Sequence, residues 1–233
     1  MNEWPTPSGM ATIGTPLLMA VLMPAMLGLW LRWSRTELVR WVSPGLSHSA
    51  SQLSVGWAVL ATMVGLLIGL FAESLPTTTP SMAMAMALAL ALLVSGLMAA
   101  SRIDLLTQLL PNRITWGLLG VGLAASLLPG WPTTPAAALA GALLGAGLVA
   151  FIIRAWPRRA SQDAPMGRGD LALLAALGAW LGPLAPFAAM GLGALLMLPL
   201  VAWGLWRQKW SGQTQLPFGP ALCIGGLLTP LLT

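Results

Sequence analysis

The sequence predicts an all-α fold, a polytopic bundle of membrane-spanning helices, on three observations. First, 57% of the 233 residues are hydrophobic and only 7% are charged, whereas an ordinary soluble domain carries about 25% charged residues. Second, apolar runs recur over the whole length and are continuous, and the chain has no Tyr. Continuous runs favour helices over a transmembrane barrel, whose strands alternate lipid-facing and lumen-facing residues.

The apolar runs divide the chain into about eight predicted spans. They cover residues 14–31, 53–72, 82–100, 114–128, 135–155, 171–184, 187–206 and 217–232. A helix needs about 20 residues to cross a bilayer, so the fourth, sixth and eighth spans are short. The boundary between the sixth and the seventh depends on Pro183 and Pro186. Glycines spaced four apart in the fifth and sixth spans are expected to let helix backbones approach closely.

The third observation is the placement of the basic residues, which predicts the orientation of the helices. All eleven Lys and Arg lie in the loops after spans one, three, five and seven, and the alternate loops have none. They are Arg32, Arg35, Arg40, Arg102, Arg113, Arg154, Arg158, Arg159, Arg168, Arg207 and Lys209. Basic loops stay in the cytosol, so both termini are expected outside. The net charge of +5 is then a topology signal, which argues for the lipid bilayer as partner and against nucleic acid.

Two of the six acids are candidates for chemistry. Glu3 and Glu73 fall on the predicted outer side. Glu37 lies among arginines in the first predicted cytosolic loop, where a solvated ion pair is expected, and Asp163 lies in a polar loop, where a solvated side chain is expected. Asp104 and Asp170 remain. Two predicted spans separate them, so both are expected at the cytosolic membrane surface. An acid buried in a membrane costs at least about 2.5–3.5 kcal/mol on insertion scales and usually marks a function.

Each aspartate also has a purely structural interpretation. Asp170 could cap the helix that follows it, and Asp104 could pair with Arg102 or Arg113. Two features favour a functional interpretation instead: the helices after both acids are short, and Gly167 and Gly169 permit close backbone approach beside Asp170.

We therefore expect the two carboxyl groups to lie close together and to share one proton, as in aspartic proteases. The ionised member can activate a water and the protonated member can donate to a peptide carbonyl, which is general acid–base hydrolysis of an amide. Other constellations are weaker. His48 is the only histidine, Cys223 is the only cysteine and lies in an apolar run, and no phosphate-binding GxxxxGK[ST] motif occurs. No metal site is predicted.

Three motifs resemble those of the prepilin peptidases, the inner-membrane aspartic proteases that process type IV pilins and type II secretion pseudopilins. Asp104 is followed by LLTQLL and then by Pro111 and Asn112, before a helix. The motif Gly-x-Gly-Asp, at Gly167, Gly169 and Asp170, opens an apolar helix, and the last span begins with LPFGPAL at residues 216–222. The resemblance covers roughly residues 52 to 233.

The resemblance implies that Asp104 and Asp170 are catalytic and that Gly167, Gly169, Pro111 and Asn112 support the site. It also implies a multi-pass protein of the bacterial inner membrane, in which residues 1–52 form an N-terminal span with a short cytosolic loop and residues 53–233 form the peptidase core. The expected substrate is a prepilin or pseudopilin with a short basic leader, cut after a glycine at the cytosolic face. No cofactor is expected for cleavage.

Two departures from the family pattern limit what the resemblance implies. Ala172 stands where many members have a Lys two residues after the second aspartate. Members that also methylate the new N-terminus, with S-adenosylmethionine, carry a larger cytosolic segment, often with two CxxC pairs; residues 33–52 are short and cysteine-free. Methylation is therefore doubtful. The alternatives are a small proton- or cation-coupled transporter that uses the same two aspartates, and an inactive scaffold for pilus assembly.

Overall fold

The computed structural model describes residues 14–74, 79–155, 168–207 and 216–231, and every element of regular structure in these ranges is helical. The all-α prediction is therefore confirmed. The helices are α2 (Gly14–Trp41), α3 (Pro44–Ser51), α4 (Val55–Ser74), α5 (Pro80–Thr107), α6 (Asn112–Ala125), α7 (Pro135–Ala155), α8 (Arg168–Leu181), α9 (Ala185–Trp206), α10 (Gly219–Leu228) and the 3₁₀ turn η1 (Thr229–Leu231).

Each predicted span contains a helix, but the helices differ in their ability to cross a membrane. Five described segments are long and apolar enough: Gly14–Trp41, Pro44–Phe71, Ser81–Thr107, Pro135–Ile152 and Ala185–Trp206. The chain is thus a multi-pass membrane protein. By contrast, α6 and α8 have 14 residues each and α10 has 10; at 1.5 Å per residue, 14 residues reach about 21 Å, less than the ~30 Å hydrocarbon core. The count of eight spans and the outward termini stay predictions.

The boundary between α8 and α9 lies at residues 182–184, slightly earlier than the predicted boundary between residues 184 and 187. Gly182 has φ +95°, and its N–H donates to the Gly178 carbonyl at 2.9 Å. A glycine in this left-handed conformation is a common way to end a helix. Pro183 follows in the break, whereas Pro186 lies inside the first turn of α9, where a missing N–H costs nothing.

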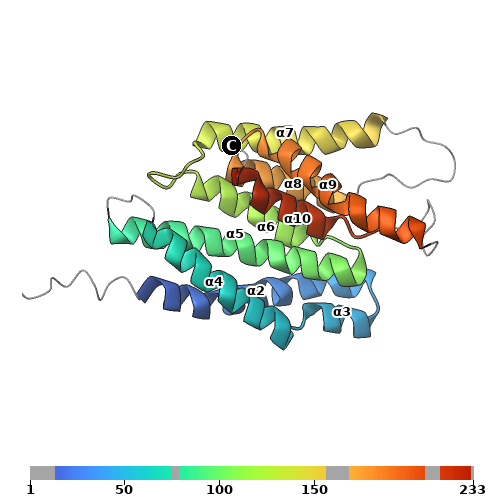
Figure 1. Cartoon of the computed structure of the whole chain (residues 1–233), viewed down its shortest axis with the longest axis horizontal. Helices are drawn as coiled ribbons and strands as arrows, with labels where there is room; N and C mark the ends of the chain where they lie inside the picture. The colour runs from blue at the N-terminus through green and yellow to red at the C-terminus, as the bar shows by residue number, and fades with distance from the viewer. Residues whose placement is uncertain (1–13, 75–78, 156–167, 208–215, 232–233) are drawn as a thin grey trace, which may run out of the picture.

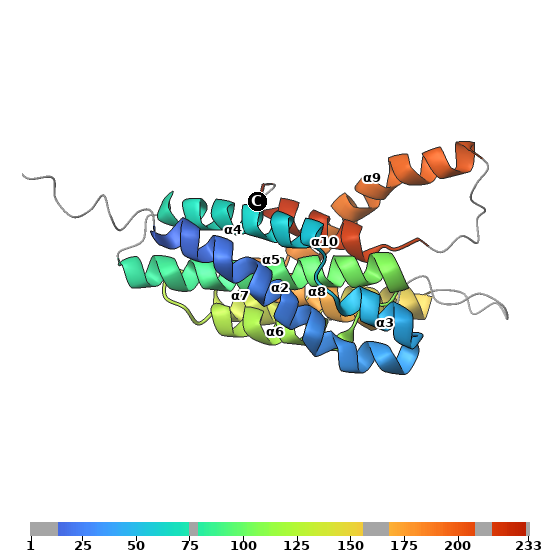
Figure 2. The same ribbon diagram turned by 90° about the horizontal axis from the view of Figure 1, so that it is seen from below.

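Most helices run roughly along one long axis, whereas α9 diverges from the bundle in Figure 2, and α5 lies between two groups of them (Figures 1 and 2). On one side α5 packs against α2 and α4; on the other it packs against α6 and α10. Helix α8 lies among α6, α7 and α9. The C-terminal ends of α5, α7 and α9 and the N-terminal ends of α6, α8 and α10 all point toward the same end of the molecule, at the right of Figure 1.

Helices α7 and α8 are in backbone contact through glycines, as the four-residue spacing predicted. A Cβ on Gly178 would overlap the Gly141 carbonyl oxygen, and a Cβ on Gly145 would overlap that of Leu174. Helices α2 and α4 use the same device, because a Cβ on Gly65 would overlap the Met19 carbonyl oxygen. Small residues at such positions allow the van der Waals packing that associates helices within a bilayer.

Trp180 fixes the position of α8 within the bundle. Its side chain is 1% exposed, and its indole N–H donates to the Leu118 carbonyl of α6 at 2.8 Å. The Trp180 carbonyl in turn accepts from the Thr133 hydroxyl at 3.0 Å. Gly122 leaves room for the ring, since a Cβ there would lie 2.6 Å from the indole Cδ1. These bonds hold the helix that carries Asp170.

Candidate active site

Asp104 lies in the last turn of α5, and its carboxylate reaches across the bundle to another helix. Helix α5 ends at Gln108, which has φ +54° and donates its N–H to the Asp104 carbonyl at 2.8 Å. The Asp104 side chain is only 4% exposed. Its Oδ2 accepts a hydrogen bond of 2.9 Å from the N–H of Gly219, the first residue of α10. A carboxylate at a helix N-terminus is stabilised there by the free N–H groups and the helix dipole.

Asp170 lies inside the first turn of α8, as its third residue, and is half-buried. It therefore does not occupy the capping position that precedes a helix. The neighbouring Gly169 lets the start of α8 press against the chain after Asp104, since a Cβ on Gly169 would lie 2.5 Å from the Leu110 Cβ. Gly167 lies outside the described residues, as do Glu3 and Asp163.

Asp104 and Asp170 lie on two helices, α5 and α8, that both contact α10. Asp104 and Asp170 are near enough for the charge of one to act on the other. Cys223 lies one turn beyond Gly219 on α10 and is 2% exposed. Two acids 66 positions apart in sequence (170 − 104) are thus within electrostatic range of each other. Their catalytic role stays a prediction.

Pro111 and Asn112 form the start of α6, a few residues after Asp104. Pro111 is buried and precedes the helix with an extended backbone (φ −66°, ψ 125°), whereas the Asn112 side chain is exposed. The residue before them, Leu110, lies close to both Gly169 of α8 and Gly219 of α10. A Cβ on Gly219 would lie 2.9 Å from the Leu110 Cδ1 and 2.8 Å from the Asp104 Oδ2.

Leu110 and Gly219 are the site residues that the sequence did not single out. Gly219 belongs to the LPFGPAL motif, so a signal for it was present in the sequence. That motif gave no indication that a backbone N–H, rather than a side chain, would bind Asp104. Leu110 carries no chemistry of its own, and only its contacts with Gly169 and Gly219 give it significance.

The structure gives Arg102 and Arg113 other partners than Asp104. Arg102 donates to the carbonyl oxygens of Gln52 at 2.7 Å and Ser49 at 3.2 Å. Arg113 donates to the Trp33 carbonyl at 3.4 Å. Within the described ranges no three His, Cys, Asp or Glu side chains gather as potential metal ligands.

The expectation for Glu37 was wrong. It is not a solvated side chain in a loop, because α2 continues to Trp41 and carries Glu37 on its last turns. The Glu37 carboxylate is half-buried and accepts the backbone N–H groups of Asn112 at 3.1 Å and Arg113 at 3.0 Å. The arginines around Glu37 made an ion pair the simpler expectation; the free N–H groups of a distant helix were not visible in the sequence.

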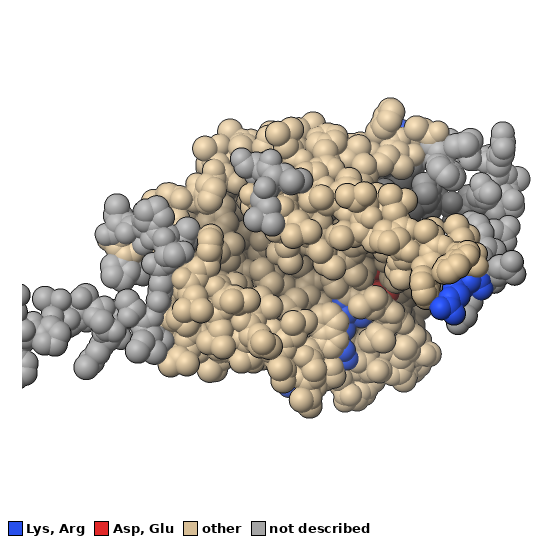
Figure 3. All heavy atoms as spheres, in the orientation of Figure 1, with Lys and Arg blue, Asp and Glu red and all other residues tan. Residues whose placement is uncertain are grey.

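The surface of the molecule places acidic atoms in a recess at this end. Figure 3 shows them in a hollow on one face of the bundle, with Lys and Arg atoms beside the hollow and toward the same end.

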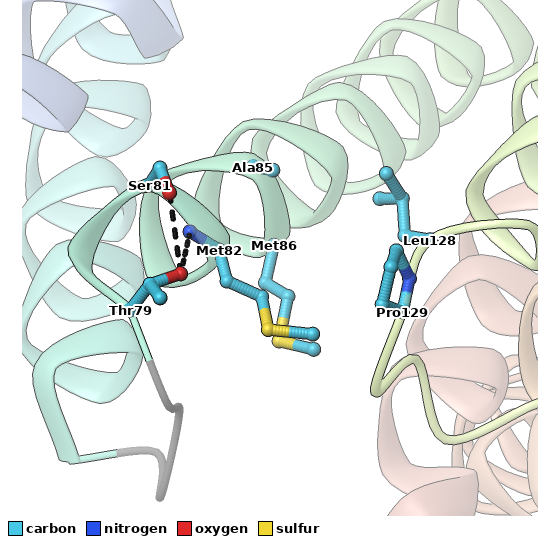
Figure 4. A pocket seen from close by; sticks show the side chains of 7 residues that line it. All are labelled: Thr79, Ser81, Met82, Ala85, Met86, Leu128 and Pro129. Atoms are coloured by element: carbon cyan, nitrogen blue, oxygen red, sulfur yellow. Dashed lines mark hydrogen bonds between the residues drawn. The ribbon is translucent and has the colours of Figure 1, made fainter.

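A separate pocket of about 380 Å³ lies at the start of α5. Figure 4 shows the Met82 and Met86 side chains side by side in it, facing Leu128 and Pro129. No charged residue lines this pocket, so it is unrelated to the two acids.

Comparison with known proteins agrees with the motifs. Residues 91–202 match the model of the Type IV leader peptidase family, a segment that includes Asp104 and Asp170. A "Prepilin leader peptidase/N-methyltransferase" of Burkholderia pseudomallei (strain 1026b) is 36% identical over 141 residues, 59% of this chain and 44% of the relative. A "Type 4 prepilin-like proteins leader peptide-processing enzyme" of Escherichia coli O78:H11 is 38% identical over 138 residues, 59% of this chain and 49% of the relative.

A longer match extends toward the N-terminus. A "Prepilin leader peptidase/N-methyltransferase" of Stutzerimonas stutzeri is 32% identical over 200 residues, 83% of this chain and 65% of the relative. The first two relatives are matched over only about half of their length, 44% and 49%. No solved structure matches the chain.

Proposed function

This chain belongs to the Type IV leader peptidase family, and we propose from that premise that it is an intramembrane aspartic endopeptidase with Asp104 and Asp170 as its catalytic pair. The observation that carries the proposal is that these two acids lie within electrostatic range of each other, and that Asp104 is 4% exposed. Two neighbouring buried carboxyl groups hold one proton between them more easily than none. This is the protonation state that amide hydrolysis by an aspartic dyad requires.

In the proposed reaction the dyad activates a water between the two carboxyl groups. The ionised carboxylate removes a proton from the water as its oxygen bonds to the carbon of the scissile amide, and the protonated carboxyl gives its proton to the carbonyl oxygen. The tetrahedral intermediate then loses the amine: the C–N bond breaks, the nitrogen takes the proton that the first carboxylate removed, and the hydroxyl proton returns to the second carboxylate. The hydrogen bond from Gly219 to Oδ2 holds Asp104 during both steps and leaves Oδ1 for the water.

The end of the bundle that carries the acids is proposed to face the cytosol in the bacterial inner membrane. The described arginines at helix ends lie at this end: Arg40 ends α2, Arg154 ends α7 and Arg207 follows α9. Basic ends stay on the cytosolic side. The shortness of α6 and α8 supports a site at the rim of the bilayer, because helices of about 21 Å need not reach both surfaces. Water has access to such a site.

The proposed substrate is a type IV prepilin or a type II secretion pseudopilin, by analogy with the relatives' names. Its basic leader would stay on the cytosolic side for the same reason as the basic loops. The cut after a glycine, just before the substrate's apolar helix, would then fall at the membrane surface beside Asp104 and Asp170. No cofactor takes part in the cleavage that we propose.

Methylation of the new N-terminus is left out of the proposal. S-adenosylmethionine, which the N-methyltransferase relatives imply, carries a sulfonium, an amino and a carboxylate group that need polar or charged partners. The uncharged pocket at the start of α5 does not fit it. Helix α3, within the first predicted cytosolic segment, makes its contacts with α2 and α5 and carries no acid.

Co-expression with a candidate prepilin tests the proposal. The wild-type protein should convert the prepilin to a form of higher mobility on a gel, and Asp104→Asn and Asp170→Asn should each leave it unprocessed while the variant still inserts. The matched control is Glu73→Gln, which removes an acid of the predicted outer side and should process normally. Cleavage at the normal rate by either aspartate variant would refute the dyad. Proton or cation uptake into vesicles without any cleavage would favour the transporter instead.

A further inference from the structure

Glu37 contacts the start of α6 with both of its carboxylate oxygens. Oε1 accepts the N–H of Asn112 at 3.1 Å and Oε2 accepts the N–H of Arg113 at 3.0 Å. These are two of the N–H groups that a helix leaves without partners in its first turn. Charge-assisted bonds of this kind are about twice as strong as neutral ones. The contact links α2 to the chain about 75 positions further on.

The residues just before these two N–H groups reach the proposed dyad. Leu110 precedes Pro111 and Asn112 and packs directly against Gly169 and Gly219. A Cβ on either glycine would overlap a Leu110 atom. Gly219 donates to Asp104, and Gly169 precedes Asp170. A shift at the start of α6 would therefore move Leu110 and, with it, the segments that carry both acids.

A second set of contacts, from residues 49–57, holds the chain just before Asp104. Arg102, two residues before it, is 9% exposed and donates to the carbonyls of Ser49 and Gln52. It also lies over the Trp57 ring, 5.8 Å from the centroid. The segment between Arg102 and Asn112 is thus held at both ends by residues from α2 to α4.

We propose that Glu37 is a positioning residue, which fixes the start of α6 and through Leu110 sets the separation of Asp104 and Asp170. Glu37 lies outside the segment that the family model matches, so its role is additional to the family motifs. The inference rests on the proposed function only where it concerns the rate of cleavage. The separation of the two acids can be measured without any substrate.

The first experiment measures that separation directly. In a Cys223→Ala background, the pair Asp104→Cys and Asp170→Cys is treated with a short thiol cross-linker. Adding Glu37→Ala should lower the cross-linking yield at least threefold, and adding Arg40→Gln should not. Arg40 is an exposed residue in the last turn of the same helix, so it controls for the loss of a charge. An equal yield with and without Glu37→Ala would overturn the inference.

The second experiment measures the hydrogen bonds themselves. Hydrogen exchange at the amides of Asn112 and Arg113 should accelerate about tenfold in Glu37→Ala and less in Glu37→Gln, which keeps one acceptor oxygen. Asn112→Pro removes one donor at the first position of α6, where Pro is tolerated, and Asn112→Ala keeps it. The Pro variant should therefore cross-link less than the Ala variant. Unchanged exchange in Glu37→Ala would also overturn the inference.

The third experiment connects position to catalysis. With a prepilin that the wild type cleaves, Glu37→Ala should lower kcat about tenfold with KM within twofold, and Glu37→Asp should restore part of the loss. Faster exchange with an unchanged kcat would show that Glu37 only caps the helix, and would overturn the positioning role. If the wild type cleaves no prepilin while cross-linking still responds to Glu37→Ala, the proposed function fails and the positioning role stands.

Discussion

Asp104 and Glu37 bind helix N-termini in the same way, yet they differ in what surrounds them. Glu37 places both oxygens on the N–H groups of α6 and is half-buried. Asp104 places Oδ2 on the N–H of α10, is 4% exposed and has a second acid, Asp170, within electrostatic range. A carboxylate with both oxygens satisfied stabilises a structure. A buried one with a neighbouring acid is the arrangement expected of a proton-transfer site.

Replacing the aspartates by asparagine tests this comparison, and it is expected to have the largest effect on the cleavage rate. Asp104→Asn and Asp170→Asn should each lower prepilin cleavage about 10⁴-fold, at the upper end of what a general acid or base contributes. Asn still offers an acceptor oxygen to Gly219, so unfolding should change by no more than about 1 kcal/mol. The measurements are initial cleavage rates and thermal unfolding in detergent.

The comparison fails if Glu37→Gln, the matched exchange, reduces cleavage as much as Asp104→Asn does. Equal losses would mean that burial and a neighbouring acid do not distinguish the two carboxylates, and that the helix-capping bond is what both contribute.

A methyl group on the donor residue is expected to have the next largest effect. Gly219→Ala puts a Cβ 2.8 Å from the Asp104 Oδ2, so the carboxylate must move while its hydrogen-bond donor remains. Displacement of a catalytic group by about 1 Å costs on the order of 10²-fold in rate. Gly120→Ala, on α6, meets nothing within 4 Å and is the control. Normal cleavage by Gly219→Ala would show that the position of Asp104 is not critical.

Trp180→Phe removes a neutral hydrogen bond between α8 and α6, away from both carboxylates. The lost bond to the Leu118 carbonyl and the smaller ring should together lower the free energy of unfolding by about 2 kcal/mol. Cleavage at low temperature should fall less than threefold. A loss of cleavage comparable to that of Gly219→Ala, in folded protein, would mean that the site depends on the whole length of α8.

Gln108→Gly should have the smallest effect. Gln108 adopts a left-handed conformation that costs an L-residue about 1–2 kcal/mol, and glycine relieves this at an entropic cost of about 0.5–1 kcal/mol. A net gain of about 0.5 kcal/mol in unfolding free energy is expected, with cleavage unchanged. Gln108→Val should shift the unfolding midpoint downward instead; an increase with Val would contradict the strain argument.

Much of the candidate site could be predicted from the sequence because acids are rare in this chain. With six acids among 233 residues and a strict segregation of arginines, Asp104 and Asp170 were the acids left without an evident solvated role. Glu37 could not be interpreted in the same way. Its partners are backbone N–H groups, which every residue carries, so no pattern of side chains points to them.

The sequence by itself determined the helical fold, the approximate bounds of the helices and the pair of acids, because hydrophobicity and charge are properties of the residues. Tertiary structure alone decided that Gly219 donates to Asp104, that Leu110 packs beside Gly169 and Gly219 and that Glu37 caps α6. These contacts join segments as far as 115 positions apart. They depend on how helices pack across the bundle, and such packing is set by many small shape contacts that no single residue encodes.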